Sequence, residues 1–421
     1  MRQESAHSGS ATANPPIPFA GTGAAEKWTA MEERMGHPLL QSLRGVRKGT
    51  LRLYLPDQSE VFYVGADPGP HANMRFSDWK TLDRIALEGD VALGEDYVAG
   101  HWQTTDLRKL LRFAAHNGGV FDRAAPPPPL SRLARFARDT LFFRRGRRPR
   151  LHPPYNNAAE FCHHWMDSTM TGSGALFHGD AGVPLEEAQR AKYRRVLGRL
   201  DPQKGEQILD LGCSFGGFME EAARLGARVT GVTLDAGEAA AAQERTAGFG
   251  DLATVRLEDY RDVTGTFDDV VSLEMFESIG EDAWPDFMDS LFRTLKAGGR
   301  AIVQTAVVRD ELFDIYRSGT DFSREHISPG SLIPTRGRFE QEARRAGLHI
   351  NDVYLFGRDQ ALTFDCWHDR LEAAAPALRE LGYCEEYLRK WSFHFANRAA
   401  LFEARRLDMV QIELSKPRSH S

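Results

Sequence analysis

The chain has 421 residues, enough for two domains and a large hydrophobic core. Its composition, 42% apolar and 27% charged, is typical of a soluble globular protein, and its net charge of −6 argues against a general affinity for nucleic acid. No apolar run approaches the roughly 20 residues of a membrane-spanning helix. The four cysteines have neither metal-ligand nor disulfide spacing, so we expect reduced thiols, a cytoplasmic location and no metal site.

A polar tail and a small domain form the first part of the chain. Residues 1–25 lack the apolar core of a signal peptide, and we expect them to be disordered. Residues 26–120 predict an α+β domain without a catalytic cluster, in which the isolated His71, His101 and His116 are structural. The expected helices cover 26–47, 79–88 and 107–115, and the expected strands cover 49–56, 61–64 and 71–76.

A proline- and arginine-rich linker, residues 121–151, follows this domain. It begins with four consecutive prolines, which are typical of a domain boundary. Residues 132–150 then hold eight arginines against one acid, Asp139, with apolar residues between them. Such a segment suits an anionic membrane surface, where each arginine contributes on the order of 1 kcal/mol. Membrane contact is favoured, and a solvated linker is the alternative.

The second domain, residues 152–421, is organised around a short buried strand, Ile208–Leu211, which runs into a glycine-rich turn and a helix. Glycines let the backbone approach a ligand closely, and the helix points its first amides at the same spot. The turn reads G-x-S-x-G-G, with Ser214 where the dinucleotide fingerprint has its middle glycine. An S-adenosylmethionine (SAM) turn is favoured, while a dinucleotide site and a plain structural turn stay open.

Strands and helices alternate around this turn, which predicts a doubly wound, Rossmann-like α/β domain with a parallel sheet. Such sheets bind ligands at the carboxyl ends of their strands. The expected strands cover 208–211, 228–234, 254–257, 268–273, 300–305 and 409–415; the expected helices cover 184–197, 219–225, 236–246, 284–294, 336–346 and 363–371, with a turn at 296–299.

Several short motifs are specific when taken together, although none is so alone. They are Gly89–Tyr97 (similar to G-D-x-x-x-G-E-x-Y), Trp165–Phe177 (W-L-D-x-x-M-T-Y-S-C-A-Y-F), Leu185–Lys192, Asp259–Asp262 (D-Y-R-D), Glu274–Gly280 (E-M-F-E-H-V-G) and His326–Gly330 (Y-I-F-P-G). From about Gly49 to Ser415 the chain thereby resembles the cyclopropane fatty acid synthase family, which includes the mycolic acid methyltransferases.

The resemblance implies transfer of a one-carbon unit from SAM to a double bond in an unsaturated phospholipid acyl chain. The alkene attacks the methyl sulfonium and leaves a carbocation. Loss of a proton from the new methyl closes a cyclopropane ring, whereas other fates give methyl-branched or methylene products. This chemistry needs a dry pocket that stabilises positive charge and a base beside the new methyl group.

The SAM site implied by the resemblance surrounds the glycine-rich turn. Ser173 matches a serine that contacts SAM in the family. The turn residues expected to shape the site are Asp210, Gly212, Ser214, Gly216 and Gly217.

The end of the next strand is expected to meet the ribose of SAM. Thr233 and Leu234 end that strand, and many methyltransferases have an acid at the position of Thr233. Here the carboxylates are displaced to Asp235 and Glu238, either of which could accept hydrogen bonds from ribose hydroxyls. The alternative role of Asp235 is a helix N-cap. Asp259 is a candidate adenine contact.

Glu277 is the residue that we expect to carry catalysis. It matches the glutamate that helps the family to hold a bicarbonate, which serves as the base. Other groups around that anion are replaced, so ring closure is in doubt. Gly172 and Gly174 stand for a tyrosine and a cysteine, Ser278 and Gln304 for two histidines, and His368 for a tyrosine. Glu277, Gln304 or His368 could bind an anion or a water molecule, and Glu277 or His368 could act as the base directly.

We therefore expect a SAM-dependent C-methyltransferase that makes a methylated or methylene-bearing fatty acid at the inner membrane surface, with the N-terminal domain associated with lipid. Ordinary cyclopropane formation is the first alternative. A lipid- or SAM-binding protein without catalysis and a small-molecule methyltransferase are the others. A homodimer and a downstream redox enzyme stay open as partners.

Overall fold

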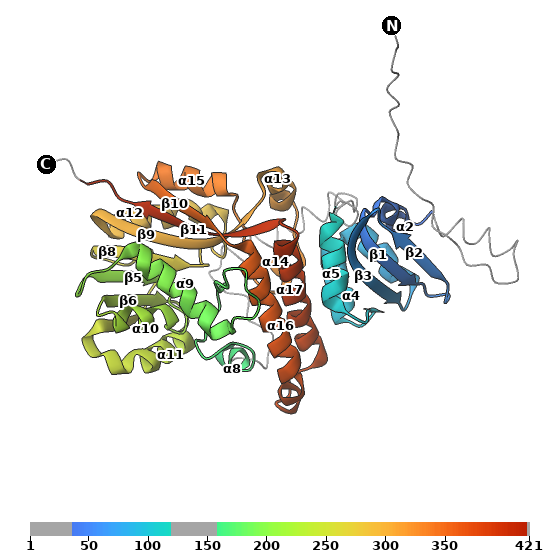
Figure 1. The fold of residues 1–421 in the computed structure, drawn as a ribbon, viewed down its shortest axis with the longest axis horizontal. Coiled ribbons are helices and arrows are strands. Elements are labelled where there is room, and N and C mark those ends of the chain that lie inside the picture. Colours follow the sequence, from blue (N-terminus) through green and yellow to red (C-terminus); the bar gives the residue numbers. More distant parts are fainter. Residues whose placement is uncertain (1–35, 119–157, 419–421) are drawn as a thin grey trace, which may run out of the picture. The chain divides into compact units, whose positions relative to one another are not determined.

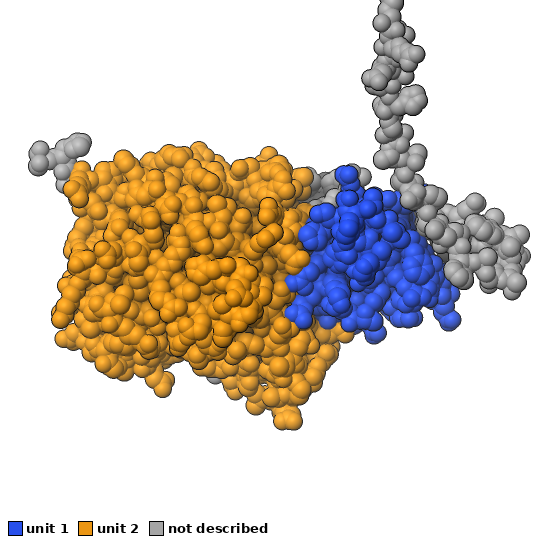
Figure 2. Space-filling view, in the orientation of Figure 1, with its two compact units in different colours: residues 1–128 blue, residues 129–421 orange. Residues whose placement is uncertain are grey.

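The computed structural model of the chain describes residues 36–118 and 158–418. These residues fall into two compact units, 1–128 and 129–421, which are coloured separately in Figure 2. The boundary between the units lies inside the predicted linker, 121–151. The predicted tail, 1–25, and the arginine-rich segment, 132–150, lie outside the described residues.

The first unit is an α+β domain, as the sequence predicts. Its sheet has the order β2-β1-β3-β4, with β1 antiparallel to β2 and parallel to β3. Leu51 and Leu53 of β1 and Val61 and Tyr63 of β2 are buried, so one face of the sheet packs against helices (Figure 1). The elements are α2 (Pro38–Ser42), η1 (Leu43–Gly45), β1 (Lys48–Tyr54), β2 (Glu60–Val64), β3 (Asp67–Phe76), α3 (Trp79–Glu88), α4 (Asp90–Val98), β4 (Trp102–Gln103) and α5 (Leu107–His116).

Helix α4 is not predicted by the sequence, because Gly89 followed by Asp90 is typical of a break. The break is real but one residue long: Gly89 has φ 62° and separates α3 from α4. The carboxylate of Asp96 is buried in this helix and accepts hydrogen bonds from Arg84 and His101. His101 therefore supplies a hydrogen-bonding partner for a buried carboxylate, in agreement with its expected structural role.

The second unit contains the predicted Rossmann-like sheet, in the order β10-β11-β9-β8-β5-β6-β7 (Figure 1). The pairs of β5 with β6 and β8, of β6 with β7 and of β8 with β9 are parallel, whereas β11 runs antiparallel to β9 and β10. The strands are β5 (Gln207–Leu211), β6 (Arg228–Thr233), β7 (Ala253–Leu257), β8 (Phe267–Leu273), β9 (Leu295–Val308), β10 (His349–Leu355) and β11 (Leu407–Ser415).

Helices cover this sheet because its strands are buried on both faces. Ile208, Leu209 and Leu211 of β5, for example, are fully buried. Helix α10 packs against both α9 and α11, and α12 packs against α15. The helices are α8 (Ala158–His163), α9 (Leu185–Leu200), α10 (Gly217–Arg224), α11 (Ala236–Thr246), η2 (Ala247–Leu252), η3 (Glu281–Ala283), α12 (Trp284–Thr294), α13 (Asp310–Ser318), α14 (Phe322–His326), α15 (Arg336–Arg345), α16 (Gly357–Glu380) and α17 (Glu385–Glu403).

Two expectations for this unit need correction. The turn predicted at 296–299 is not a break before the strand, because β9 begins at Leu295 and the pairing register with β8 shifts across these residues. The helix predicted at 363–371 is part of the longer α16, which pairs with the unpredicted α17 (Figure 1). None of the helices in residues 36–118 and 158–418 is long and apolar enough to cross a membrane.

Candidate active site

The glycine-rich turn after β5 takes the conformation that its glycines permit. Gly212 has φ 81° and Gly216 has φ 77°, and Ser214 lies in the same left-handed region at φ 47°. Space is also limited, since a Cβ on Gly217 would lie 2.9 Å from the hydroxyl of Tyr193. Gly216 starts α10 without a side-chain cap, which leaves the first amides of the helix pointing at the carboxyl edge of the sheet.

A fully buried lysine lies beside this turn. Lys192 of α9 donates a hydrogen bond from Nζ to Ser173 Oγ at 2.5 Å. Burial lowers the pKa of Lys192 to about 7, against the opposing field of Glu274, Asp167 and Asp210. Burial likewise raises the pKa of Asp210 to about 7. Because Asp210 Oδ2 has no hydrogen-bond partner among the described residues, it is an acceptor that a ligand could use.

A chain of amides leads from the protein surface to the carboxylate of Glu274. Arg195 Nη1 donates to Gln411 Oε1, Gln411 Nε2 donates to Gln304 Oε1, and Gln304 Nε2 donates to Glu274 Oε1 at 2.6 Å. A guanidinium can only donate, so Arg195 fixes the orientation of both amides. Gly174 N also donates to Glu274 Oε1 at 2.6 Å. Burial raises the pKa of Glu274 in spite of these donors.

Glu277 lies close to this chain, at the start of the segment that follows β8. Its carboxyl group accepts hydrogen bonds from Thr305 Oγ1 at 2.7 Å and from Ala306 N at 3.2 Å, both on β9. Burial, with the negative field of Glu274 added, raises the pKa of Glu277 to about 8. Glu277 is therefore mostly protonated at pH 7 and becomes a base as the pH rises through 8.

The end of β6 places its polar side chains as the sequence suggests. Thr233 Oγ1 donates to Glu238 Oε2 at 2.6 Å. Asp235 caps α11, accepting from Gly237 N at 2.8 Å and from the backbone N of Glu238 at 3.1 Å, which is the structural alternative considered for it. Leu234 is 54% exposed. Ribose binding by these residues stays a prediction.

Asp259 and His368 have other partners than those expected. Asp259 is held by the guanidinium of Arg261 at 2.7 and 3.0 Å, and this hydrogen-bonded cation lowers the pKa of Asp259. His368 Nε2 lies 3.0 Å from Ser392 Oγ in the contact between α16 and α17. Its hydrogen bond thus leads toward α17 rather than to Glu277, and a catalytic role for His368 stays a prediction.

Gln360 of α16 is a site residue that sequence reasoning missed. Its side chain fills the space in front of Gly174, where an added Cβ would lie 1.5 Å from Gln360 Oε1. That oxygen is buried and has no hydrogen-bond partner among the described residues. Lys192 and Glu274 were missed too, although both lie in motifs that carry the family resemblance. Nothing in the sequence alone marks them, since Lys192 lies among other charged residues of its helix.

Comparison with known proteins identifies the family. Residues 146–412 match the family model described as mycolic acid cyclopropane synthetase. The chain belongs to this family. The tuberculostearic acid methyltransferase UfaA1 of Mycobacterium tuberculosis is 30% identical over 347 residues, which cover 78% of this chain and 79% of that protein. The cyclopropane-fatty-acyl-phospholipid synthase of Escherichia coli is 27% identical over 353 residues, which cover 82% of this chain and 88% of that protein.

Solved structures agree with this family and with the predicted fold. The cyclopropane synthase MmaA2 from Mycobacterium tuberculosis is 26% identical with a TM-score of 0.58, covering 62% of this chain and 95% of that one. The mycolic acid cyclopropane synthase CmaA1, complexed with SAH and CTAB, is 27% identical with a TM-score of 0.57, covering 62% and 94%. The family resemblance and the methyltransferase fold are thereby confirmed.

Proposed function

We propose that this member of the family transfers a one-carbon unit from SAM to the double bond of an unsaturated phospholipid acyl chain and yields a methylated or methylene-bearing fatty acid. The relative UfaA1 is named for methylation of a fatty acid, and the Escherichia coli relative for modification of phospholipid acyl chains. The observation that carries the proposal is the buried carboxyl group of Glu277, which accepts hydrogen bonds from Thr305 and Ala306 and lies in the field of Glu274.

SAM is the cofactor, in keeping with the family and with the bound SAH of CmaA1, and it supplies an electrophilic methyl group. Asp210 Oδ2 and the amides at the start of α10 offer an acceptor and donors at one edge of the sheet. Ser173 is oriented by Lys192. The residues assigned to SAM are Ser173, Asp210, Gly212, Ser214, Gly216 and Gly217, with Thr233, Leu234, Asp235, Glu238 and Asp259 toward the nucleoside.

The side chains beside Glu277 do not fit a bicarbonate. Gly172 and Gly174 carry no side-chain donor, and the backbone amide of Gly174 and the side-chain amide of Gln304 already donate to Glu274. Glu277 itself would offer an anion only the proton that it carries below pH 8. We therefore assign proton acceptance to Glu277, whose own carboxylate is the base at the upper end of the physiological pH range.

The product follows from the fate of the carbocation. Proton loss to Glu277 from a chain carbon next to the cation gives a methylated alkene, and proton loss from the new methyl closes a ring. A methylene group forms when a hydride first shifts from the methyl-bearing carbon to the cationic carbon and the new methyl then loses a proton. A saturated methyl branch additionally needs a hydride, which a redox partner would supply. Lipid mass analysis of cells expressing the protein should reveal a gain of one CH2 unit, or of CH2 and two hydrogens where a redox partner supplies the hydride, and chromatography against cyclopropane standards separates ring from branch. A pure cyclopropane product would replace this proposal by ordinary ring formation.

Two other candidate functions give different results in the same assays. A lipid- or SAM-binding protein without catalysis would form no SAH with unsaturated vesicles. A small-molecule methyltransferase would act on soluble amines and leave vesicles unchanged. Peripheral contact with an anionic membrane, a homodimer and a cytoplasmic location complete the proposal, and vesicle flotation and sedimentation equilibrium measurements test the first two.

A further inference from the structure

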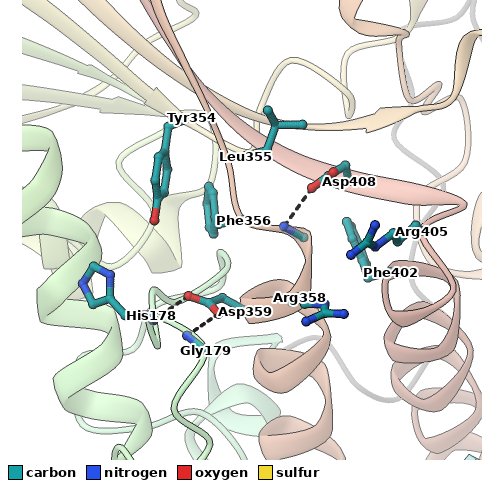
Figure 3. A pocket seen from close by; sticks show the side chains of 11 residues that line it. His178, Gly179, Tyr354, Leu355, Phe356, Arg358, Asp359, Phe402, Arg405 and Asp408 are labelled. Atoms are coloured by element: carbon teal, nitrogen blue, oxygen red, sulfur yellow. Dashed lines mark hydrogen bonds between the residues drawn. The ribbon is translucent and has the colours of Figure 1, made fainter.

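A cavity of about 440 Å³ opens at the carboxyl end of β10, away from the glycine-rich turn (Figure 3). Its wall combines the end of β10, the first turn of α16, the last turn of α17 and the start of β11. Figure 3 shows Arg358 and Arg405 beside Phe402 on one side of this cavity, and His178 and Tyr354 on the other. No residue assigned above to SAM or to proton transfer lines it.

The cavity is lined by two arginines and two aspartates, which differ in how their charged groups are bonded. Arg358 and Arg405 are exposed, and neither guanidinium forms a hydrogen bond or an ion pair within residues 36–118 and 158–418. The carboxylate of Asp359, by contrast, accepts hydrogen bonds from the backbone amides of His178 at 2.7 Å and of Gly179 at 3.0 Å. The carboxylate of Asp408 also accepts hydrogen bonds from backbone amides.

Asp408 accepts from the backbone amides of Gly357 at 2.8 Å and Met409 at 2.9 Å, and burial raises the pKa of its carboxyl group. Both acids are thus satisfied by backbone donors, and the arginines stay available to an anion. Arg405 also has φ 56°, directly after α17, where glycine is the usual residue. An arginine here carries a backbone strain of about 1 kcal/mol relative to glycine.

The floor of the cavity is apolar. Phe356 and Phe402 are buried, and Leu355 at the rim is 50% exposed. The ring of Phe402 stacks on that of Phe364 with centroids 6.0 Å apart, so the floor continues into the aromatic layer between α16 and α17. A guanidinium pair above an apolar floor matches an amphipathic anion, and a planar guanidinium binds phosphate oxygens in a fixed geometry.

One short segment joins this cavity to the candidate active site. Gly174 donates to Glu274 in the site, and Gly179 donates to Asp359 at the cavity. These two residues can lie at most about 17 Å apart, because the chain between them spans no more than about 3.4 Å per residue. A single lipid with its double bond in the middle of an acyl chain can bridge this distance.

We infer that the cavity binds the phosphodiester of the phospholipid whose acyl chain is modified, with Arg358 and Arg405 as its phosphate ligands. The inference rests on the proposed function. According to this inference, the second unit binds the head group of the lipid substrate. This binding does not depend on the expected attraction between residues 132–150 and an anionic membrane.

The test compares the double variant Arg358→Gln/Arg405→Gln with a matched control, Arg228→Gln/Arg344→Gln, which removes the same charge from exposed positions elsewhere. Equilibrium binding of a saturated short-chain phosphatidylglycerol, below its micelle concentration, should weaken at least tenfold in the double variant and less than twofold in the control. Inorganic phosphate alone should bind the unmodified protein far more weakly than the lipid. Equal affinity for both would mean a free-phosphate site and would overturn the lipid assignment.

Turnover separates this inference from the proposed function. In neutral detergent micelles, KM for unsaturated phosphatidylglycerol should rise at least tenfold in the double variant, whereas kcat and the rate on unsaturated diacylglycerol should stay within twofold. If the unmodified protein modifies phospholipid and the double variant behaves as the control does, the head-group site is wrong and the function stands. If the unmodified protein modifies no lipid, the proposed function itself fails.

Discussion

Replacing Glu277 by Gln tests the proton acceptor most directly. The glutamine keeps the shape of the side chain. Its oxygen can still accept from Ala306 N, while the Thr305 hydroxyl can turn to the carbonyl oxygen of Ala306, 3.2 Å away, and accept from the new amide. Loss of a general base costs about 10²–10⁴-fold in rate. We therefore expect kcat to fall by at least about 100-fold, with the Kd for SAM unchanged.

The dependence of kcat on pH provides a quantitative test of the same role for Glu277. Only the ionised form of Glu277 accepts a proton, so kcat should rise about tenfold per pH unit below the pKa of about 8 and level off above it. Initial rates of SAH formation with unsaturated vesicles, measured from pH 6.5 to 9, supply the profile. In Glu277→Gln the tenfold rise per pH unit up to pH 8 should be lost, and only the titration of Lys192 and Asp210 near pH 7 should remain. A profile that is flat in the unmodified protein, or equally steep in the variant, would refute the reasoning.

Ionisation of Glu277 with rising pH should increase activity but lower the free energy of unfolding. The pKa of Glu277 is raised from 4.5 to about 8 on folding, so the contribution of this group to stability is complete below pH 4.5 and is lost as the pH rises to 8. At about 1.4 kcal/mol per pH unit the ceiling of this loss is roughly 5 kcal/mol, which partial exposure of the side chain reduces to about 2 kcal/mol. Urea unfolding at pH 8 should therefore find Glu277→Gln more stable than the unmodified protein, and equally stable at pH 4.5.

Three further outcomes are expected. Lys192→Met leaves the buried acids around it without a cation and should lower the free energy of unfolding by about 3 kcal/mol in urea titrations, a loss that Asp210→Asn in the same chain partly restores. Gly174→Ala should destabilise by about 1–3 kcal/mol because its Cβ overlaps Gln360, and the double variant with Gln360→Ala should recover most of this loss; additive effects would contradict the contact. Replacement of four arginines by neutral residues, at positions 144, 145, 147 and 148, should weaken the flotation of the protein with anionic vesicles at low salt. Unchanged flotation would mean that this segment is a linker without a role in membrane binding.

The sequence predicts the frame of the catalytic unit well, because the frame depends on local patterns. Short buried strands, the glycine-rich turn and the cap of α11 by Asp235 are all set by residues near one another in the chain. Asp90 in α4 is the instructive failure. A glycine and an acid suggest a loop, but one residue at φ 62° is enough to start a new helix.

The candidate site is only partly predictable, because its chemistry depends on pairs that are distant in sequence. Glu277 was found through a motif, whereas Gln360 lies 186 residues after Gly174 and carries no motif that marks it. The amide orientation of Gln304 likewise depends on Arg195, more than a hundred residues earlier. A single sequence shows that the tyrosine and cysteine of the family are absent, but only the fold shows what fills their space.

Two adjacent residues of α16 contact the two ends of the segment that contains Gly174. Asp359 holds the segment at His178 and Gly179, while the next residue, Gln360, packs against Gly174 at the other end of the same segment. A side chain at position 174 would displace the end of the Gln360 side chain, on the same turn of α16 as Asp359. We therefore expect the backbone contacts of Asp359 with His178 and Gly179 to persist in Gly174→Ala, because the overlap involves only the end of the Gln360 side chain.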